Sequence, residues 1–445
     1  MTPRHKQGGF IPSLRLFWLH PRRYFLLMGL FCLFSFVVGY QLLLGTIIPT
    51  IAGDGWVSRI SQVWRISDYI RSPQDIEVYR CQYLGKCHQH SALLNRQFQF
   101  WSEKSMSMQE HLEKAYQRCK DKKARCARYY LRNNVIHIHE DDFDMATTYN
   151  RGRALADTLL LLAARINLPD AAFVFVFGDH NIVEIEPDTN PKLDHLPLLF
   201  SSFSTDGFAD VPVPNPCMLW LSGEWRTLSS WSIPSFSSKR DVAFWRGSPT
   251  GGDYDGSGWR VTPRSQLVRQ SLRHSDMIDC HFTKCSSCPS AAALGGMIAP
   301  AVSMRQMLRY RYLVIVDGNN APSSRYATLL GATSPSVMIK QNSSFGEWFY
   351  PLMKPFVHYL PVHHDFGDLT QLISYARDHP ELAEEIARNG RDFVWKYLSF
   401  DGVLCHWHSI LMRMRSILAD DLTVNERSHY VPLTLWKMYA KDKCW

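Results

Sequence analysis

The amino-acid sequence predicts an α/β protein of two domains behind a single N-terminal membrane-spanning helix. Two observations predict the α/β class: helical patterns alternate with buried strand patterns from Asn134 to Asp179, and a second alternating set begins at Asp241. A third observation, an uncharged apolar segment near the start of the chain, predicts the membrane helix. The length of 445 residues exceeds one ordinary hydrophobic core, so two domains are expected.

The N-terminal segment has the pattern of a signal anchor. Residues 1–23 contain five basic residues and no acidic residue, so we expect them to form a cytosolic tail. Residues 24–44 are uncharged over about twenty positions, enough for a helix to span a bilayer. A cleaved signal peptide is the alternative, but its apolar core would be shorter. The sequence therefore predicts a single-pass type II protein of the Golgi or endoplasmic reticulum membrane, with 45–97 as a lumenal stem.

Charge and cysteine content fit a lumenal protein. The formal net charge is +8, five of these charges lie in the tail, and the remainder is too small for a nucleic-acid-binding surface. Ten cysteines follow Cys32, an even number that suits disulfides in an oxidising compartment. The spacing C-x4-C-x2-C at 280–288 is also compatible with three zinc ligands. Because no fourth ligand stands at an obvious spacing, structural disulfides are the favoured interpretation.

The first predicted domain covers residues 98–238. We expect a helix within 98–130, a strand at 134–139, a helix at 147–166 and a buried strand at 171–179. This strand–helix–strand order favours a parallel sheet. Residues 196–238 are rich in Pro, Ser and Trp and predict loops across the face of this domain.

The second predicted domain covers residues 239–400, and residues 401–445 are expected to form C-terminal helices that pack back, followed by a tail. The segment DVAFWRG predicts a strand and a turn, and YRYLVIVDG predicts a buried strand. Helices are expected at 265–274, 302–309 and 325–333, with a further strand at 336–340 and a helical pair at 368–398.

Two loops of the second domain have the composition of an anion site. One follows the strand that ends at Asp317, and Ser324 and Arg325 stand where the next helix begins. A helix start and a guanidinium both favour a bound phosphate, although an arginine that only pairs with a neighbouring acid is the alternative. The other loop carries an arginine, a glycine for close backbone approach and a hydroxyl donor, namely Arg246, Gly247 and Ser248. Two such loops at strand ends indicate a diphosphate site.

A carboxylate follows the last strand of the first domain. The sequence VFVFGDHN puts Asp179 at the carboxyl end of that strand, beside His180. If the domains face each other, Asp179 could take a proton from an attacking hydroxyl. The alternative is a helix N-cap, and His180 is expected to be a surface or supporting residue.

The acidic segment EDDFD offers a competing site. Asp142 and Asp144 resemble the acidic pair that holds Mn2+ or Mg2+ in many nucleotide-sugar enzymes. An acidic cap on the following helix is the favoured interpretation, because the helix dipole would stabilise it.

Three ordered segments resemble glycosyltransferase family 90, which includes Rumi-like protein O-glucosyltransferases and capsule-associated xylosyltransferases. They are FWRGSPTGG, YRYLVIVDGNNAPSSRYATLL and EWFYPLMKPFVHYLPVHHDFGDL. The resemblance is dense from 242 to 407 and looser from 134 to 200. It implies a GT-B-like enzyme in which two Rossmann-type domains hold a UDP-sugar, invert the anomeric centre and need no metal or other cofactor.

The resemblance also implies residue roles. Asp179 matches the family's catalytic base, although the chain has Asp-His-Asn where the family more often has Asp-x-Pro. Arg246 and Arg325 match the arginines of the diphosphate, and Ser324 lies in the matching loop. Trp245 and His180 are candidate contacts for the sugar or the acceptor. The sequon at Asn342 is a candidate N-glycosylation site in a lumenal domain.

Several functional alternatives follow from the sequence. The donor is UDP-glucose or UDP-xylose, which differ by one hydroxymethyl group, and the acceptor is a protein or a glycan hydroxyl. A metal-dependent transferase would use Mn2+ at Asp142 and Asp144 and lose activity with chelator. A non-catalytic lumenal glycan-binding protein on the same fold would bind sugar without transferring it.

Overall fold

The computed structural model describes residues 91–185, 196–218, 232–252, 258–283, 295–322 and 324–433. All of them belong to one compact unit, Ile66–Trp445. The predicted cytosolic tail, membrane anchor and almost all of the stem lie outside these residues. No helix within the described ranges is long and apolar enough to cross a bilayer.

The first sheet has six strands in the order β11-β2-β1-β3-β4-β5. Four of these strands pair antiparallel, and β4 and β5 continue the sheet parallel to β3. The strands are β1 (Cys126–Arg132), β2 (Val135–His139), β3 (Ala171–Val176), β4 (Leu199–Ser201), β5 (Val211–Pro212) and β11 (Tyr430–Pro432). The prediction of a parallel sheet is confirmed for β3, β4 and β5 only, because β1 lies between β2 and β3 and runs antiparallel to both.

The turn between β1 and β2 explains this departure. Asn133 and Asn134 connect the strands, with φ of 49° and 63°. Two residues with positive φ form the kind of tight hairpin whose twist matches that of the strands, and Asn tolerates this backbone conformation. The Asn134 amide also donates to the Ala163 carbonyl at 2.7 Å and accepts from the Leu168 amide at 3.0 Å. The side chain therefore ties the hairpin to the next helix–strand connection.

Helices cover the first sheet. They are α5 (Ser91–Gln97), α6 (Met108–Asp121), α7 (Phe143–Thr147), α8 (Asn150–Ala163), α15 (Phe400–Ile417) and α16 (Val424–Arg427). The helix predicted within 98–130 is α6 alone, and the predicted loops of 196–238 contain β4 and β5. The C-terminal helix α15 contacts α5, α8 and β3, so the chain returns to the first sheet.

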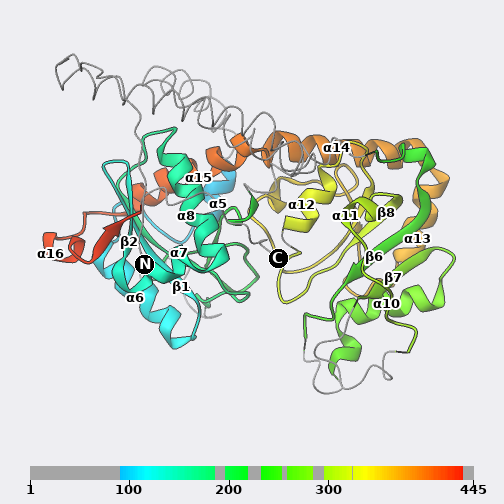
Figure 1. Cartoon of the computed structure of the whole chain (residues 1–445), viewed down its shortest axis with the longest axis horizontal. Helices are drawn as coiled ribbons and strands as arrows, with labels where there is room; N and C mark the ends of the chain where they lie inside the picture. The colour runs from blue at the N-terminus through cyan, green and yellow to red at the C-terminus, as the bar shows by residue number, and fades with distance from the viewer. Residues whose placement is uncertain are drawn as a thin grey trace, which may run out of the picture. The chain divides into compact units, whose positions relative to one another are not determined.

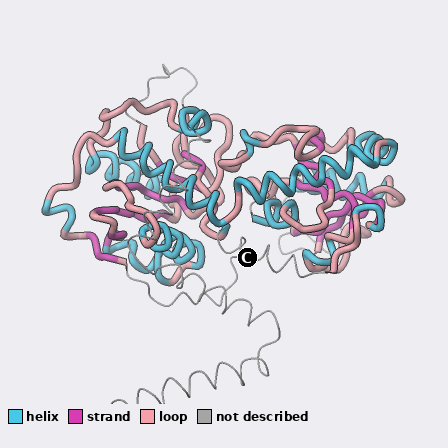
Figure 2. The backbone as a smooth tube through the Cα atoms, turned by 90° about the horizontal axis from the view of Figure 1, so that it is seen from above, coloured by secondary structure: helices cyan, strands magenta, loops and turns pink. Residues whose placement is uncertain are grey.

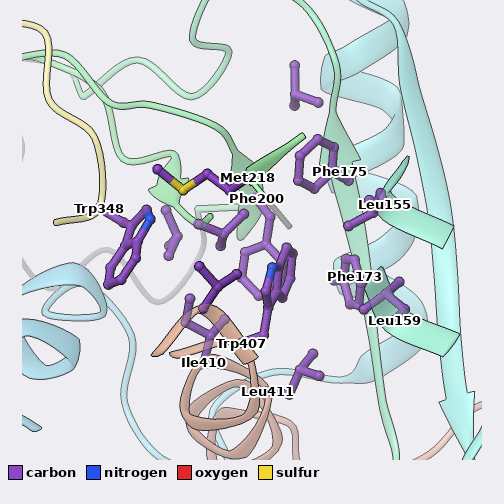
Figure 3. Close-up of a cluster of buried hydrophobic side chains, with 14 of the residues drawn as sticks. Leu155, Leu159, Phe173, Phe175, Phe200, Met218, Trp348, Trp407, Ile410 and Leu411 are labelled. Carbon is purple, nitrogen blue, oxygen red and sulfur yellow. The ribbon is translucent and has the colours of Figure 1, made fainter. Parts of the chain in front are cut away.

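The packing of α15 is clearest at Trp407. Its ring lies 6.5 Å from Phe173, 6.5 Å from Phe175 and 6.3 Å from Phe200. Figure 3 shows these aromatic side chains meeting between α15 and the strands, with Leu155 and Leu159 of α8 beyond them. Burying several large aromatic side chains in one cluster contributes a substantial share of the stability of this half.

The second sheet is entirely parallel, in the order β7-β6-β8-β9-β10. Its strands are β6 (Arg240–Gly247), β7 (Ile278–Phe282), β8 (Tyr310–Ile315), β9 (Val337–Gln341) and β10 (Leu360–Val362). The helices between and after them are α10 (Pro263–Arg273), α11 (Met304–Met307), α12 (Ser324–Leu330), α13 (Leu369–Asp378) and α14 (Pro380–Tyr397). Figures 1 and 2 show strands flanked by helices in this half. The predicted second α/β set is confirmed, with β7 and β10 added.

Several contacts join the two halves. Ser204 and Gly346 exchange two backbone hydrogen bonds of 2.8 Å, which link the loop after β4 to the loop after β9. Trp348 stacks on His406 of α15 at 4.0 Å between ring centroids. One hydrophobic cluster contains side chains of both sheets.

The cysteines follow the prediction in part. Cys119 and Cys126 form a disulfide between α6 and β1. Cys217 and Cys405 each take part in a disulfide as well. Cys280 is a free, buried thiol in β7, so the predicted disulfide is wrong for this residue of the 280–288 group. The strand turns Cys280 into the core, where its sulfur lies 3.9 Å from the Ala243 carbonyl.

Candidate functional site

The candidate site lies at the carboxyl edge of the second sheet. If the five strands are numbered in chain order, they lie side by side in the order 2-1-3-4-5. The chain leaves β6 toward one side of the sheet and continues from β8 toward the other, so the strand order reverses between β6 and β8. In open parallel sheets, ligands bind outside the carboxyl ends of the strands at this switch point. The loops after β6 and β8 are the two segments in which the sequence predicts an anion site.

These two loops touch. Gly251 has φ of +92°, and its amide donates to the Asn319 side chain at 3.1 Å. A Cβ at Gly251 would lie 2.6 Å from the Gly318 carbonyl oxygen, so the close approach of the backbones requires glycine.

Arg264 of α10 joins the same loops from the side. Its guanidinium donates to the Asp317 carbonyl at 2.8 Å and to the Ser248 carbonyl at 2.7 Å. The sequence analysis missed this residue. Its only signal was a basic residue at a helix start, which by itself does not show which loops the side chain reaches.

Arg246 has a carboxylate partner. Its side chain is buried and donates to Asp279 Oδ1 at 2.6 Å and to the Asp279 and Trp245 carbonyls at 2.8 and 3.0 Å. Burial raises the pKa of Asp279, but the hydrogen bonds from His281 and Arg246 outweigh it and leave that pKa below its ordinary value. In this structure most of the donors of Arg246 are therefore engaged within the second sheet.

Arg325 has different surroundings. It donates to the Arg246 carbonyl at 2.9 Å, which puts its guanidinium at the carboxyl end of β6. Among the described residues no carboxylate forms an ion pair with Arg325. The residue keeps an exposed surface, yet the protein around its guanidinium displaces enough water to lower its pKa. A cation that is partly desolvated and lacks a counter-ion attracts an anionic ligand.

Asp317 lies two residues after the end of β8 and is 6 % exposed. Its backbone amide donates to the Gln341 side chain at 3.0 Å, and its Oδ2 atom has no hydrogen-bond partner. Desolvation raises the pKa of Asp317, opposed by a hydrogen bond from Ser343 and by the charges of Lys340 and Arg264. Asp317 therefore lies beneath the loop and shapes it from the inside.

Asp179 follows β3 of the first sheet and reaches this site. Its Oδ1 atom accepts from Arg151 of α8 at 3.1 Å and from the Asn320 side chain at 3.3 Å. The side chain is 40 % exposed, and within the described part of the chain nothing bonds to its Oδ2 atom. The structure therefore brings the candidate base next to the loop after β8. The N-cap alternative does not hold, because no helix begins after Asp179 in the described residues 180–185.

The turn after Asp179 is held by buried polar groups. Asp210 accepts from the backbone amides of Ile182 and Val183 at 3.0 and 2.8 Å, and burial raises the pKa of Asp210 to about 6. Asn181 donates to the Phe203 carbonyl at 3.0 Å. The Asp-His-Asn variation on the family pattern thus has a structural use, since Asn181 anchors the turn.

The remaining predicted contacts have these positions. Trp245 is only 6 % exposed and packs edge-on against Phe282, so it is a core side chain of the second sheet. His180 is exposed. The Gly247 carbonyl accepts from Thr283, and a Cβ at Gly247 would collide with the Trp245 ring. The side chain of Ser324 lies outside the described residues.

The acidic pair does not fit a metal site. Asp142 is buried, and its two oxygens accept from the Tyr116 hydroxyl at 2.8 Å and from the Arg128 backbone and side chain at 2.9 and 2.8 Å. Asp144 is exposed, and the described residues contain no group of three His, Cys, Asp or Glu side chains able to hold a metal. The acidic-cap interpretation is confirmed in position, because Asp142 is the N-cap residue of α7 and Asp144 lies in its first turn, although the Asp142 side chain makes no cap hydrogen bond.

Comparison with known proteins gives a consistent result. The model of glycosyl transferase family 90 matches residues 82–441. Protein O-glucosyltransferase 2 of Danio rerio is 26 % identical over 294 residues, 64 % of this chain and 54 % of the relative. Protein O-glucosyltransferase 1 of Rattus norvegicus is 28 % identical over 199 residues, 44 % of this chain and 47 % of the relative. The O-glucosyltransferase rumi homolog of Aedes aegypti is 31 % identical over 244 residues, 50 % of this chain and 56 % of the relative.

The fold is a mixed α/β fold with one parallel and one mixed sheet, and the family match identifies the family. The chain belongs to glycosyl transferase family 90. It spans about half the length of the curated relatives described above.

Proposed function

We propose that this protein is an inverting glycosyltransferase that moves a sugar from a UDP-sugar to a hydroxyl of a protein or glycan. One observation carries the proposal. Arg325, a guanidinium with no carboxylate partner among the described residues, lies at the switch point of a parallel sheet where such sheets bind nucleotides. Glucose is the donor sugar that we propose first, because the relatives are named O-glucosyltransferases, and xylose is the alternative.

The proposed reaction divides between the two sheets. The free Oδ2 atom of Asp179 accepts the proton of the acceptor hydroxyl while that oxygen attacks the anomeric carbon. The bond from this carbon to the UDP oxygen breaks, and negative charge collects on the diphosphate. Arg325 stabilises that charge, and Arg246 and Arg264 hold the strand end and the loops that position it. Attack from the side opposite the leaving group inverts the anomeric centre.

We propose that this reaction needs no metal ion. Arg325 can neutralise the leaving group, whereas the oxygens of Asp142 accept hydrogen bonds from Tyr116 and Arg128. A transferase that depends on Mn2+ at Asp142 and Asp144 would have to break this network.

The test follows UDP release by the full chain from UDP-glucose and from UDP-xylose, with chelator present and with acceptor or water as nucleophile. We expect release with one donor, and its loss in Asp179→Asn. Release only with added Mn2+ would reject the metal-free reaction. UDP binding without any release would support the non-catalytic alternative.

A lumenal location of the second sheet in the Golgi or endoplasmic reticulum is part of the proposal. Asn342 of the sequon is exposed at the end of β9, so a glycan can be attached there. We expect peptide N-glycosidase to increase the mobility of the chain expressed in secretory cells, but not that of Asn342→Gln. An unchanged mobility of the wild type would remove the glycan from the proposal.

A further inference from the structure

Two consecutive asparagines in the loop after β8 have partners on opposite sides. The Asn319 side chain accepts from the amide of Gly251, in the glycine-rich loop after β6. The Asn320 side chain donates to Asp179, in the turn after β3 of the other sheet, at 3.3 Å. The Asn320 carbonyl accepts from the Gly318 amide at 3.0 Å, which fixes the turn that carries both side chains. One short loop therefore contacts both the proposed donor site and the proposed base.

The contacts of Asp179 all fall on one of its oxygens. Oδ1 accepts from Arg151 as well as from Asn320, and the same Arg151 nitrogen donates to the Phe177 carbonyl at 2.9 Å. Arg151 is thereby fixed to the end of the strand that carries Asp179. With Oδ1 held from two directions, rotation about the carboxylate is restricted and Oδ2 is left to face a substrate.

We propose that Asn320 and Arg151 are positioning residues for Asp179, and that Asn320 makes the orientation of the base depend on the loop that lines the donor site. The inference rests on the proposed function. A general base must lie within hydrogen-bond distance of the hydroxyl whose proton it takes, and a misplacement of about 1 Å can reduce the rate about a hundredfold. The neutral amide of Asn320 can hold Asp179 without repelling its charge, which a carboxylate could not do.

Other charged and titratable groups near this turn can also affect the pH dependence of the reaction. Arg151 faces Asp179 from α8, and His180 follows it in the chain. Asp210 holds the next residues of the turn, and Asp317 begins the loop that carries Asn320. Because all four remain unchanged when Asn320 is replaced, the difference between variant and wild type reports on the contact with Asp179.

The test is the pH dependence of kcat/KM for UDP release, compared between Asn320→Asp and wild type. Two adjacent carboxylates disfavour each other's ionisation, so the acid limb of the profile should move to higher pH by about one unit or more. Affinity for UDP, measured by calorimetry, should fall by a similar factor in Asn320→Asp and Asn319→Asp, because each adds one negative charge to the loop that lines the proposed donor site. Asn319→Asp is the matched control: it makes the same chemical change one residue earlier, and its acid limb should coincide with that of wild type.

Arg151 provides a second pair of variants in case Asn320→Asp does not fold. Arg151→Met removes a positive charge beside Asp179 and should move the acid limb in the same direction, whereas Arg151→Lys should largely restore it. Two results would overturn this inference alone, provided that the wild type releases UDP. One is an acid limb of Asn320→Asp that coincides with that of the wild type, and the other is an acid limb of Asn319→Asp that shifts as far as that of Asn320→Asp. No UDP release by the wild type from either donor would overturn the proposed function and this inference with it.

Discussion

Two cations lie at opposite edges of the parallel sheet and have different surroundings. At the amino edge, Lys239 is 4 % exposed, and its ammonium donates to the Leu308 and Ser334 carbonyls at 2.7 and 2.8 Å and to the Ser336 hydroxyl at 2.9 Å. At the carboxyl edge, the one hydrogen bond that Arg325 donates within the described part of the chain goes to the Arg246 carbonyl. Lys239 thus ties together the chain before β6, β8 and β9, whereas most donors of Arg325 are left for a ligand. The difference separates a structural cation from the one that we propose to bind the donor, within one sheet.

The largest effect should come from the base that faces the carboxyl edge. Asp179→Asn keeps the shape of the side chain but removes the proton acceptor, so the rate of UDP release should fall by roughly 10²–10⁴-fold. Affinity for UDP should not change, because we propose that Asp179 acts on the acceptor rather than on the diphosphate. Rapid-quench or coupled assays of UDP release measure this, with thermal unfolding as the control for folding. A rate within threefold of wild type would remove Asp179 from the mechanism.

The next largest effect concerns Arg325, the cation at the carboxyl edge. Arg325→Gln should reduce turnover by roughly 10²–10³-fold, because the leaving group loses its charge stabilisation. Affinity for UDP should fall as well. Arg240→Gln is the matched control: Arg240 is exposed at the amino end of β6 and donates to the Tyr310 hydroxyl at 3.1 Å. Equal losses in the two variants would mean that general charge, rather than the switch point, supports activity.

A smaller effect is expected at the amino edge, and on stability rather than on activity. Lys239→Met leaves three buried acceptors without a donor, which should lower the free energy of unfolding by about 1–3 kcal/mol. Affinity for UDP at a temperature where the variant is folded should match that of wild type. Denaturant titration measures the free energy of unfolding, and calorimetry measures the affinity for UDP. A Lys239→Met variant that unfolds like wild type but binds UDP poorly would contradict the structural role of Lys239.

The smallest effect at neutral pH concerns Asp210. Its pKa is raised by burial from 3.8 to about 6, so the folded protein binds the proton more tightly than the unfolded chain. Asp210 therefore contributes stability below pH 4 that is lost as the pH rises to 6. Asp210→Asn should flatten the fall of the unfolding free energy over this window. Near pH 7 the relief of a buried charge and the loss of one acceptor oxygen should largely cancel. An unchanged slope between pH 4 and 6 would contradict the assignment.

Sequence reasoning predicted the second sheet better than the first, for a physical reason. Buried parallel strands are continuous apolar runs that end in turns, as in LVIVDG, and such runs stand out in a sequence. The short strands β7 and β10 lack this pattern and were missed. In the first sheet, β1 reads CARYYLR, with charged and aromatic residues that also suit a helix. The pair Asn133-Asn134 was the available signal for a hairpin, and it was not used.

The candidate site divides in the same way. Asp179 could be found because it closely follows a recognisable strand, and Arg325 because it stands where a recognisable helix begins. Arg264, Arg151 and Asn320 could not, because their roles depend on contacts over 53, 28 and 141 residues of sequence. The pairing of Arg246 with Asp279 likewise depends on the adjacent strand β7, which was not predicted. Residues that bind can be found from local patterns, whereas residues that hold them depend on the tertiary structure.

The division of work between the two sheets is tested most directly by calorimetric titration of UDP into the full chain as wild type, Arg325→Gln and Asp179→Asn. We predict that wild type and Asp179→Asn bind UDP with the same affinity, and that Arg325→Gln binds at least about tenfold more weakly, a loss of about 1.4 kcal/mol. Weaker binding in Asp179→Asn together with unchanged binding in Arg325→Gln would contradict the assignment of the donor to the switch point of the parallel sheet.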